Sequence, residues 1–229
     1  MERFTYLIWD LFFLTIWLLF FLLRKDLRKQ SLILGGIIAG LTPLVGWWYL
    51  RDYWNPAFMF EINIFGLKTG PDEILMGFLI GAISSIVFEV VFKKKLEQKK
   101  KPHLWAFPVF LLGGVYLVAV FLVLKVGLNS IYASFVSWIV GIIILSFLRR
   151  DLIVSGLISG VLFMAILFFS YVRWLELLFP GTIVAWWKLS NLSGLLVFGV
   201  PIEEIIWGFL WGWLAGMLYE VWRGLGPKK

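Results

Sequence analysis

The chain has 229 residues, of which 61% are hydrophobic and only 15% are charged, and its mean hydropathy is +0.92. A soluble domain needs more polar surface than this composition provides, so it excludes an ordinary soluble protein and indicates an integral membrane protein. The formal net charge is +7, but no motif pairs basic with aromatic residues as RNA-binding domains do, so we expect no nucleic-acid partner.

Seven apolar segments are long enough to cross a bilayer as helices, because a hydrocarbon core of about 30 Å takes about 20 helical residues. The first segment ends in a charged turn with no small-residue cleavage site, so we predict a retained anchor and not a signal peptide. In chain order, the predicted spans are residues 5–23, 32–50, 72–92, 105–124, 131–148, 152–171 and 202–222.

Lysine and arginine residues gather after the first, third, fifth and seventh predicted spans. These basic stretches, at residues 24–29, 93–101, 149–150 and 223–229, all fall on one side of a seven-span chain. By the positive-inside rule that side is cytoplasmic, which predicts a multi-pass protein of the cell membrane with its N-terminus outside and its C-terminus in the cytoplasm. The positive charge is therefore expected to contact anionic membrane lipid.

An internal repeat organises the chain. Residues 72–81 match residues 203–212 at a constant offset of 131, and residues 24–27 resemble residues 149–152 at an offset of 125. The six-residue difference between the offsets falls in the predicted outer loops, where insertions are easily tolerated. Each repeat is expected to hold three helices, with a basic turn after the first and an aromatic outer segment before the third.

The repeat predicts the fold class: an all-α integral membrane protein whose seven transmembrane helices form two parallel three-helix repeats plus one linking helix. The first repeat takes residues 1–95, the basic inner loop and the linking helix take residues 96–128, and the second repeat takes residues 129–229. Without the linking helix the two units would be inverted relative to each other. Repeats of this kind often place a site at the interface between the halves.

The third helix of each repeat begins with two acidic residues. Glu73 and Glu204 lie one turn before a stripe of small residues, which lets neighbouring helices approach closely. The alternative is that these acids have no further role, since the helix dipole stabilises negative charge at a helix N-terminus. Because carboxylates within a membrane are costly and usually functional, we expect these acids to face the protein interior. The small residues are Gly77, Gly81 and Ser85 in one helix, and Gly208, Gly212 and Gly216 in the other.

Three other acids lie within the predicted spans, and two of them are weaker candidates. Glu89 and Glu220 lie near the predicted cytoplasmic ends of their spans, where a side chain can reach water. Asp10 lies inside the first span and has no counterpart in the second repeat.

The motif at residues 201–204, Pro-Ile-Glu-Glu, opens a helix within a three-span unit that also has a basic turn and a Trp-rich outer segment at residues 47–55. This combination resembles the lycopene cyclase domain family of membrane carotenoid cyclases. In that family two such units act together, as two subunits in the heterodimeric type or as one fused chain, and this sequence is similar to the fused form. The first copy, Pro71-Asp72-Glu73, is one residue shorter and has Asp in place of the first Glu.

The resemblance implies an enzyme of the intramolecular lyase or isomerase class, which cyclises an end group of a lycopene-like polyene without net redox change. A carboxylic acid protonates the terminal double bond, an internal double bond attacks the carbocation, and a carboxylate takes the proton that is lost. An acid in a low-dielectric site can stay protonated, and neighbouring acids disfavour double ionisation. By this resemblance the catalytic residues are Glu203, Glu204, Glu73 and Asp72.

A carbocation needs stabilisation without a nucleophile, and aromatic ring faces provide it. The chain has 14 Trp, 22 Phe and 7 Tyr residues. For any single Trp, the alternative is a place in the aromatic belt at the membrane interface. The predicted substrate-binding residues are Trp207, Trp211, Trp54 and Trp187.

We expect no cofactor and no metal. No Gly-x-Gly-x-x-Gly motif follows a strand, so no flavin-binding domain is predicted. The chain has no cysteine and a single histidine, His103, in the basic loop. The expected partners are a long polyene substrate and membrane lipid, while the oligomeric state stays open.

Four alternatives accompany this hypothesis. A CAAX-type intramembrane protease also has Glu-Glu at a helix start, but it needs an Arg where Gly208 stands, and histidines from other helices. A microbial rhodopsin needs a Schiff-base lysine, and residues 202–222 contain none. A non-catalytic carotenoid-binding, lipid-binding or transport protein of the same fold stays open. So does a carotenoid hydratase, in which water captures the cation.

Overall fold

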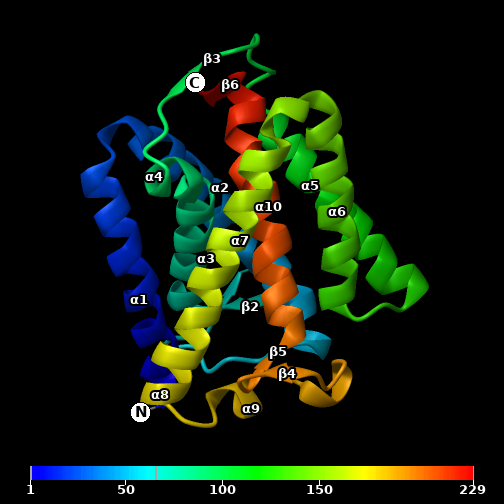
Figure 1. Ribbon diagram of the computed structural model, residues 1–229. Helices are drawn as coiled ribbons and strands as arrows, with labels where there is room; N and C mark the ends of the chain where they lie inside the picture. The colour runs from blue at the N-terminus through cyan, green and yellow to red at the C-terminus, as the bar shows by residue number, and fades with distance from the viewer. Residues whose placement is uncertain (1, 65, 229) are drawn as a thin grey trace.

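The computed structural model describes residues 2–64 and 66–228, and most of them form a bundle of roughly aligned helices (Figure 1). Short 3₁₀ or π segments lengthen or join several helices. The α-helices are α1 (Glu2–Leu23), α2 (Arg28–Asp52), α3 (Pro71–Ser84), α4 (Val87–Val91), α5 (Phe107–Phe121), α6 (Ser130–Leu148), α7 (Ile153–Phe169), α8 (Glu176–Leu178), α9 (Thr182–Trp186) and α10 (Ile202–Arg223). The short segments are η1 (Lys25–Leu27), η2 (Leu122–Val126), η3 (Arg150–Leu152), η4 (Ser170–Leu175) and η5 (Leu189–Asn191).

Within the described residues, five helical stretches are long and apolar enough to cross a membrane, as judged by length and composition. They are Phe4–Leu23, Lys25–Asp52, Phe107–Val126, Ser130–Leu148 and Arg150–Leu178. The other two predicted spans correspond to α3 with α4 and to α10. The helix α3 has only 14 residues, and α10 has 22 residues but carries several charged side chains.

The prediction that residues 72–92 form one helix is wrong. The helix α3 ends at Ser84 and α4 begins at Val87. Gln30 Nε2, from α2, donates a hydrogen bond of 2.5 Å to the Ser85 carbonyl, which would otherwise accept from an amide of the next turn. The Ser84 and Ser85 hydroxyls also donate to carbonyls of the preceding turn, a contact that weakens a helix locally.

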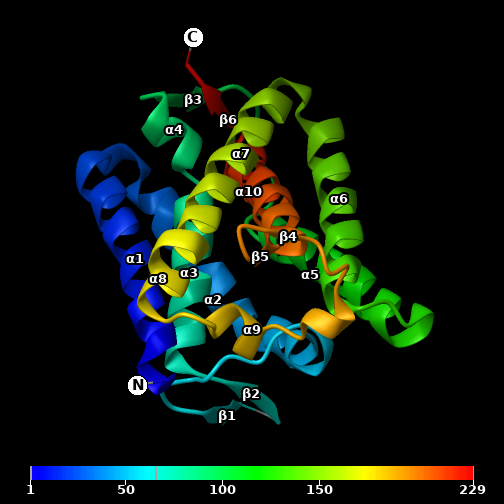
Figure 2. The same cartoon turned by 60° about the horizontal axis from the view of Figure 1, so that its bottom comes forward.

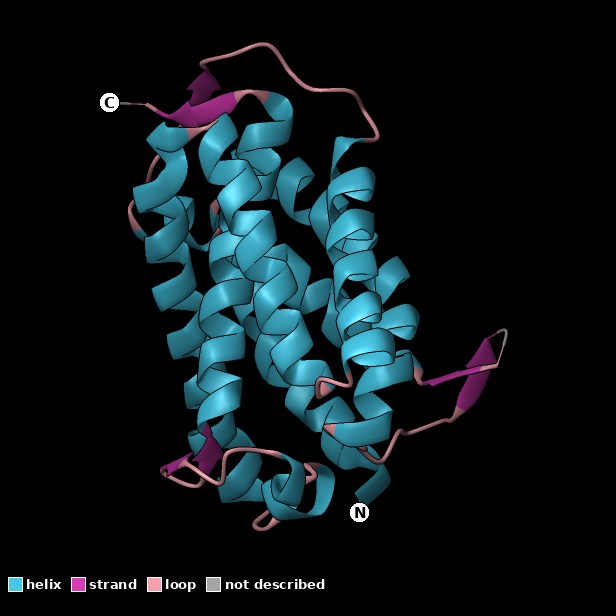
Figure 3. Ribbon diagram, turned by 90° about the vertical axis from the view of Figure 1, so that its right-hand side faces the viewer, coloured by secondary structure: helices cyan, strands magenta, loops and turns pink. Residues whose placement is uncertain are grey.

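In the part of the chain that the structure describes, three short antiparallel ribbons make the all-α description incomplete. They are β1 (Ile62–Ile64) with β2 (Leu67–Thr69), β3 (Leu96–Gln98) with β6 (Leu225–Pro227), and β4 (Leu196–Val197) with β5 (Val200–Pro201). The β1–β2 and β4–β5 ribbons lie with α9 at the end of the bundle that holds the N-terminus (Figure 2). The β3–β6 ribbon lies with the C-terminus at the opposite end (Figure 3).

The helices of the two halves pack in the same way. The helix α2 packs along α3 and α1 contacts α3, while α7 packs along α10 and α6 contacts α10. The small-residue stripes make these approaches close, because a β-carbon on Gly81 would lie 2.7 Å from Ile38 Cγ1, and one on Gly212 would lie 2.7 Å from Phe163 Cβ. The helix α5 lies at the side of the bundle against α6 (Figure 1).

The basic turns of the two halves share one hydrogen-bond pattern. Arg24 donates from Nε and Nη2 to the Asp26 carboxylate at 2.9 and 2.7 Å, and Arg149 donates in the same way to Asp151 at 2.8 and 2.7 Å. Each arginine also donates from Nη1 to a main-chain carbonyl of its own half, that of Glu89 or of Glu220.

The expectation that Glu89 and Glu220 reach water is wrong, since their side chains are only 2% and 1% exposed. The basic loop folds back over the end of α10, where the Lys99 amide donates to the Gly224 carbonyl at 2.8 Å. Glu220 Oε1 instead accepts a hydrogen bond of 2.8 Å from Gln30 Nε2 of the first half.

Candidate functional site

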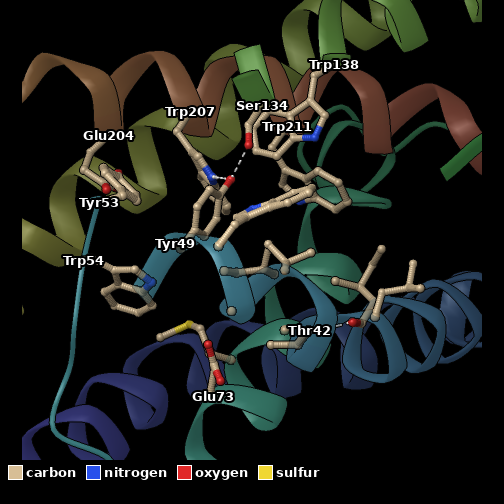
Figure 4. Close-up of a pocket in the computed structure, with 18 of the residues that line it drawn as sticks. Thr42, Tyr49, Tyr53, Trp54, Glu73, Ser134, Trp138, Glu204, Trp207 and Trp211 are labelled. Carbon is tan, nitrogen blue, oxygen red and sulfur yellow. Dashed lines mark hydrogen bonds between the residues drawn. The ribbon is translucent and has the colours of Figure 1, made fainter. Parts of the chain in front are cut away.

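A large cavity lies between the two halves of the bundle, and its walls are mainly aromatic and aliphatic side chains (Figure 4). The empty space that it encloses, together with the open space at its mouth, is about 1190 Å³. Glu73 of α3 and Glu204 of α10 both line it. Each is about 4% exposed, so both acids are enclosed by protein as the sequence predicts.

The Glu204 carboxyl group has a hydrogen-bond donor on each oxygen. Trp187 Nε1 donates to Oε1 at 2.6 Å, and the Tyr171 hydroxyl of η4 donates to Oε2. Trp187 forms an isolated antiparallel bridge with Trp54 of the first half, which fixes it in place. An indole N–H can only donate, so these neighbours suit a carboxylate that accepts.

The Glu73 carboxyl group has a different set of neighbours. The hydroxyl of Thr69, the last residue of β2, donates to Glu73 Oε2 at 2.6 Å. Oε1 faces Gly46 of α2, where a β-carbon would lie only 2.8 Å away, so a larger residue there would displace the acid. In the described part of the chain no hydrogen bond reaches Oε1, and Glu73 therefore presents a free oxygen to the cavity.

Asp72 and Glu203, the first acids of the two pairs, do not line the large cavity. Asp72 Oδ2 accepts from the Met59 amide at 2.8 Å, and Glu203 Oε1 accepts from the Ser193 amide at 2.8 Å and from the Tyr132 hydroxyl at 2.9 Å. Consecutive helical side chains diverge because the helix has 3.6 residues per turn. The structure thus separates each pair: the first acid bonds to the segment that precedes its helix, and the second faces the cavity.

The four tryptophans predicted to bind substrate all line this cavity. The rings of Trp207 and Trp211 stack at 6.4 Å on α10, and Trp138 of α6 contacts both at 5.3 and 5.5 Å. The rings of Trp54 and Trp187 lie 5.4 Å apart. Aromatic faces therefore surround the space between the acids and α6.

A second polar group lies in the wall beside Trp207. Trp207 Nε1 donates to the Tyr49 hydroxyl at 3.2 Å, and that hydroxyl shares a hydrogen bond of 2.8 Å with Ser134 Oγ (Figure 4). These bonds join α10 and α2 to α6 and fix the orientation of the Trp207 ring.

Tyr171, Thr69 and Trp138 contribute to the site but were not predicted from the sequence. Tyr171 ends a predicted span, where a tyrosine is typical of the membrane interface and gives no catalytic signal. Asp10 is fully buried, and in the described structure neither of its carboxyl oxygens has a hydrogen-bond partner. Among residues 2–64 and 66–228, no group of three or more His, Asp or Glu side chains is arranged to hold a metal ion.

A comparison with family models matches residues 129–222 to the family described as lycopene cyclase. The matched segment contains α6, α7 and α10 and includes Glu204, its donors Tyr171 and Trp187, and the rings on α10. No curated protein matches the chain, and no solved structure does.

Proposed function

We propose that this chain, whose residues 129–222 belong to the lycopene cyclase family, is a membrane carotenoid cyclase that closes an end group of a linear polyene without net redox change. The observation that carries the proposal is the convergence of Glu73 and Glu204, one from each half, on one apolar and aromatic cavity. An apolar polyene suits these walls, and the two acids supply a proton donor and a proton acceptor.

The neighbours of the two acids support different roles for them. Glu73 acts as the acid: its free oxygen delivers a proton to the terminal double bond, and the internal double bond then forms the ring bond. Glu204 acts as the base and takes the proton from the carbon next to the ring cation, while Tyr171 and Trp187 hold its two oxygens. One proton enters and one leaves, so substrate and product have the same mass.

The aromatic wall supports the cationic intermediate. Trp207, Trp211 and Trp138 offer ring faces to a positive charge, an attraction of about 2 kcal/mol or more when the cation is desolvated. An apolar wall also keeps water away from the cation, which favours cyclisation over hydration.

The proposed enzyme spans the membrane seven times as two parallel three-helix repeats joined by α5. The shared packing of α2 with α3 and of α7 with α10 supports this arrangement, as do the matching turns at Arg24 and Arg149.

The chain has no cysteine, so single cysteines at Gln98 and Asn191 can be labelled selectively. We expect Gln98 to be labelled from the cytoplasm and Asn191 from outside. Labelling of both from one side would contradict seven spans.

The test of function is coexpression with a lycopene-producing pathway, followed by chromatography and mass spectrometry of the pigments. We expect a cyclic product with the mass of the substrate, formed by purified protein without added flavin or nicotinamide. A product heavier by one water would identify a hydratase. Unchanged lycopene that copurifies with the protein would identify a carotenoid-binding protein without this activity.

A further inference from the structure

The large cavity reaches well beyond the two acids, under the linking helix α5. Leu112, Val115, Tyr116 and Ala119 of α5 line it, and their spacing of three or four residues places them on one face of the helix. We call this part of the cavity the α5 channel. The opposite face of α5 is exposed and apolar, as at Leu117, which is 66% exposed.

Most helices around the cavity pack closely against at least one other helix. The helix α5 packs on α6, α6 on α10, α10 on α7, and α1 and α2 on α3, but no extended packing joins α2 to α5 in the described structure. Among the ring pairs and hydrogen bonds of the described residues, one of each crosses this α2–α5 seam. The rings of Trp48 and Tyr116 stack at 4.6 Å, and the Tyr116 hydroxyl donates to the Leu44 carbonyl at 3.2 Å.

Both rings that cross the seam also line the cavity. Leu44 and Trp47, which follow Pro43 in α2, are 38% and 36% exposed. A proline within a helix removes one hydrogen bond and lets the helix bend at that point. The seam therefore combines weak helix packing, a stacked pair of rings and a helix that can bend.

The shape of a polyene substrate indicates a role for this seam in substrate entry. This inference rests on the function proposed above. Conjugated double bonds keep a long polyene extended, so it cannot coil up beside the acids when its end group reacts. The rest of the chain must lie in a channel that leads away from the acids. A polyene dissolved in the bilayer reaches a protein of this kind from the side.

We propose that the α5 channel binds the unreactive part of the polyene, and that the polyene enters it from the bilayer through the α2–α5 seam, which Trp48 and Tyr116 close. The channel walls at Leu112, Val115 and Ala119 are apolar, as the occupant requires. Tyr116 is thus a positioning residue, which acts on substrate access and not on the reacting atoms.

The absence of native cysteine allows a direct test. Cysteines replace Leu44 and Tyr116, and a short bis-methanethiosulfonate reagent then joins them across the seam and can be removed by a thiol reductant. The protein is placed in phosphatidylcholine vesicles that contain lycopene. Quenching of tryptophan fluorescence reports lycopene uptake, and chromatography reports ring formation. We expect the cross-link to lower both by at least about tenfold and the reductant to restore both.

A matched control pair lies outside the cavity. Gln98 and Leu225 face each other across the β3–β6 ribbon, and cysteines there should accept the same cross-link without loss of uptake or ring formation. Unchanged uptake in the cross-linked seam variant would overturn the proposed portal. Because uptake is measured separately from ring formation, the portal can be judged even if the protein binds lycopene without cyclising it.

A second pair of variants tests the channel itself. Ala119, which is 2% exposed, becomes Phe to fill the channel, and the lipid-facing Leu117 of the same helix becomes Phe as the control. We expect Ala119→Phe to lower kcat/KM for lycopene by at least about tenfold while Leu117→Phe changes it little. Equal kcat/KM values for the two variants, with equal protein levels, would contradict polyene binding under α5.

Discussion

Glu73 and Glu204 stand at equivalent helix positions, 131 residues apart, yet their neighbours differ. The Tyr171 hydroxyl donates to Glu204, whereas the residue 125 positions before Tyr171 is Gly46, which places no side chain beside Glu73. The Thr69 hydroxyl donates to Glu73, whereas the residue 131 positions later is Val200. Similar helix pairs can therefore bring two acids to one cavity while unlike neighbours give them different tasks.

The largest expected loss of activity comes from substitution of Glu204, the acid with a hydrogen-bond donor on each oxygen. Glu204→Gln keeps the size of the side chain but removes the base, so ring formation should fall by roughly 10²-fold or more at unchanged protein level. Chromatography of pigments from lycopene-producing cells measures it. The control is Glu61→Gln, an exposed acid paired with Lys68 outside the cavity. Turnover near that of the unmodified protein would contradict the proposed role of Glu204 as the base.

Substitution of Tyr171 tests whether the hydrogen-bond donors around Glu204 affect ring formation. Tyr171→Phe keeps the ring but removes one donor from Glu204, which should slow ring formation by about tenfold, the equivalent of about 1.4 kcal/mol. Tyr219→Phe is the matched control, because Tyr219 is a buried tyrosine of the same half that does not line the cavity. Equal rates in the two variants would show that the Tyr171 hydroxyl does not serve Glu204.

Substitution of Glu203 should lower the stability of the protein more than its turnover. Glu203→Ala leaves the Ser193 amide and the Tyr132 hydroxyl without their acceptor, which should cost about 1–3 kcal/mol in the free energy of unfolding. Asp72→Ala loses one such bond and should cost less. Thermal unfolding in detergent checks both. A large loss of turnover with unchanged stability would instead place Glu203 in the chemistry.

The sequence predicts the inward position of Glu73 and Glu204 because both share a helical stripe with small residues, and that pattern depends only on local spacing. Features that depend on distant residues were not predictable. The helix break near Ser85 depends on Gln30, which lies 55 residues away along the chain. The carboxyl group of the buried Glu220 accepts a hydrogen bond from Gln30, which lies 190 residues away along the chain. The α5 channel likewise arises only when α5 packs beside the second half.

The central claim is that each half contributes one acid to a single reaction. The most direct test compares ring formation by Glu73→Gln, Glu204→Gln and the double variant, each at matched protein level. We expect Glu73→Gln alone to lose roughly 10²-fold or more, and the double variant to be little worse than the poorer single variant, because residues that act as a unit are strongly non-additive. Turnover of Glu73→Gln near that of the unmodified protein would contradict the claim and leave the chemistry to the second half.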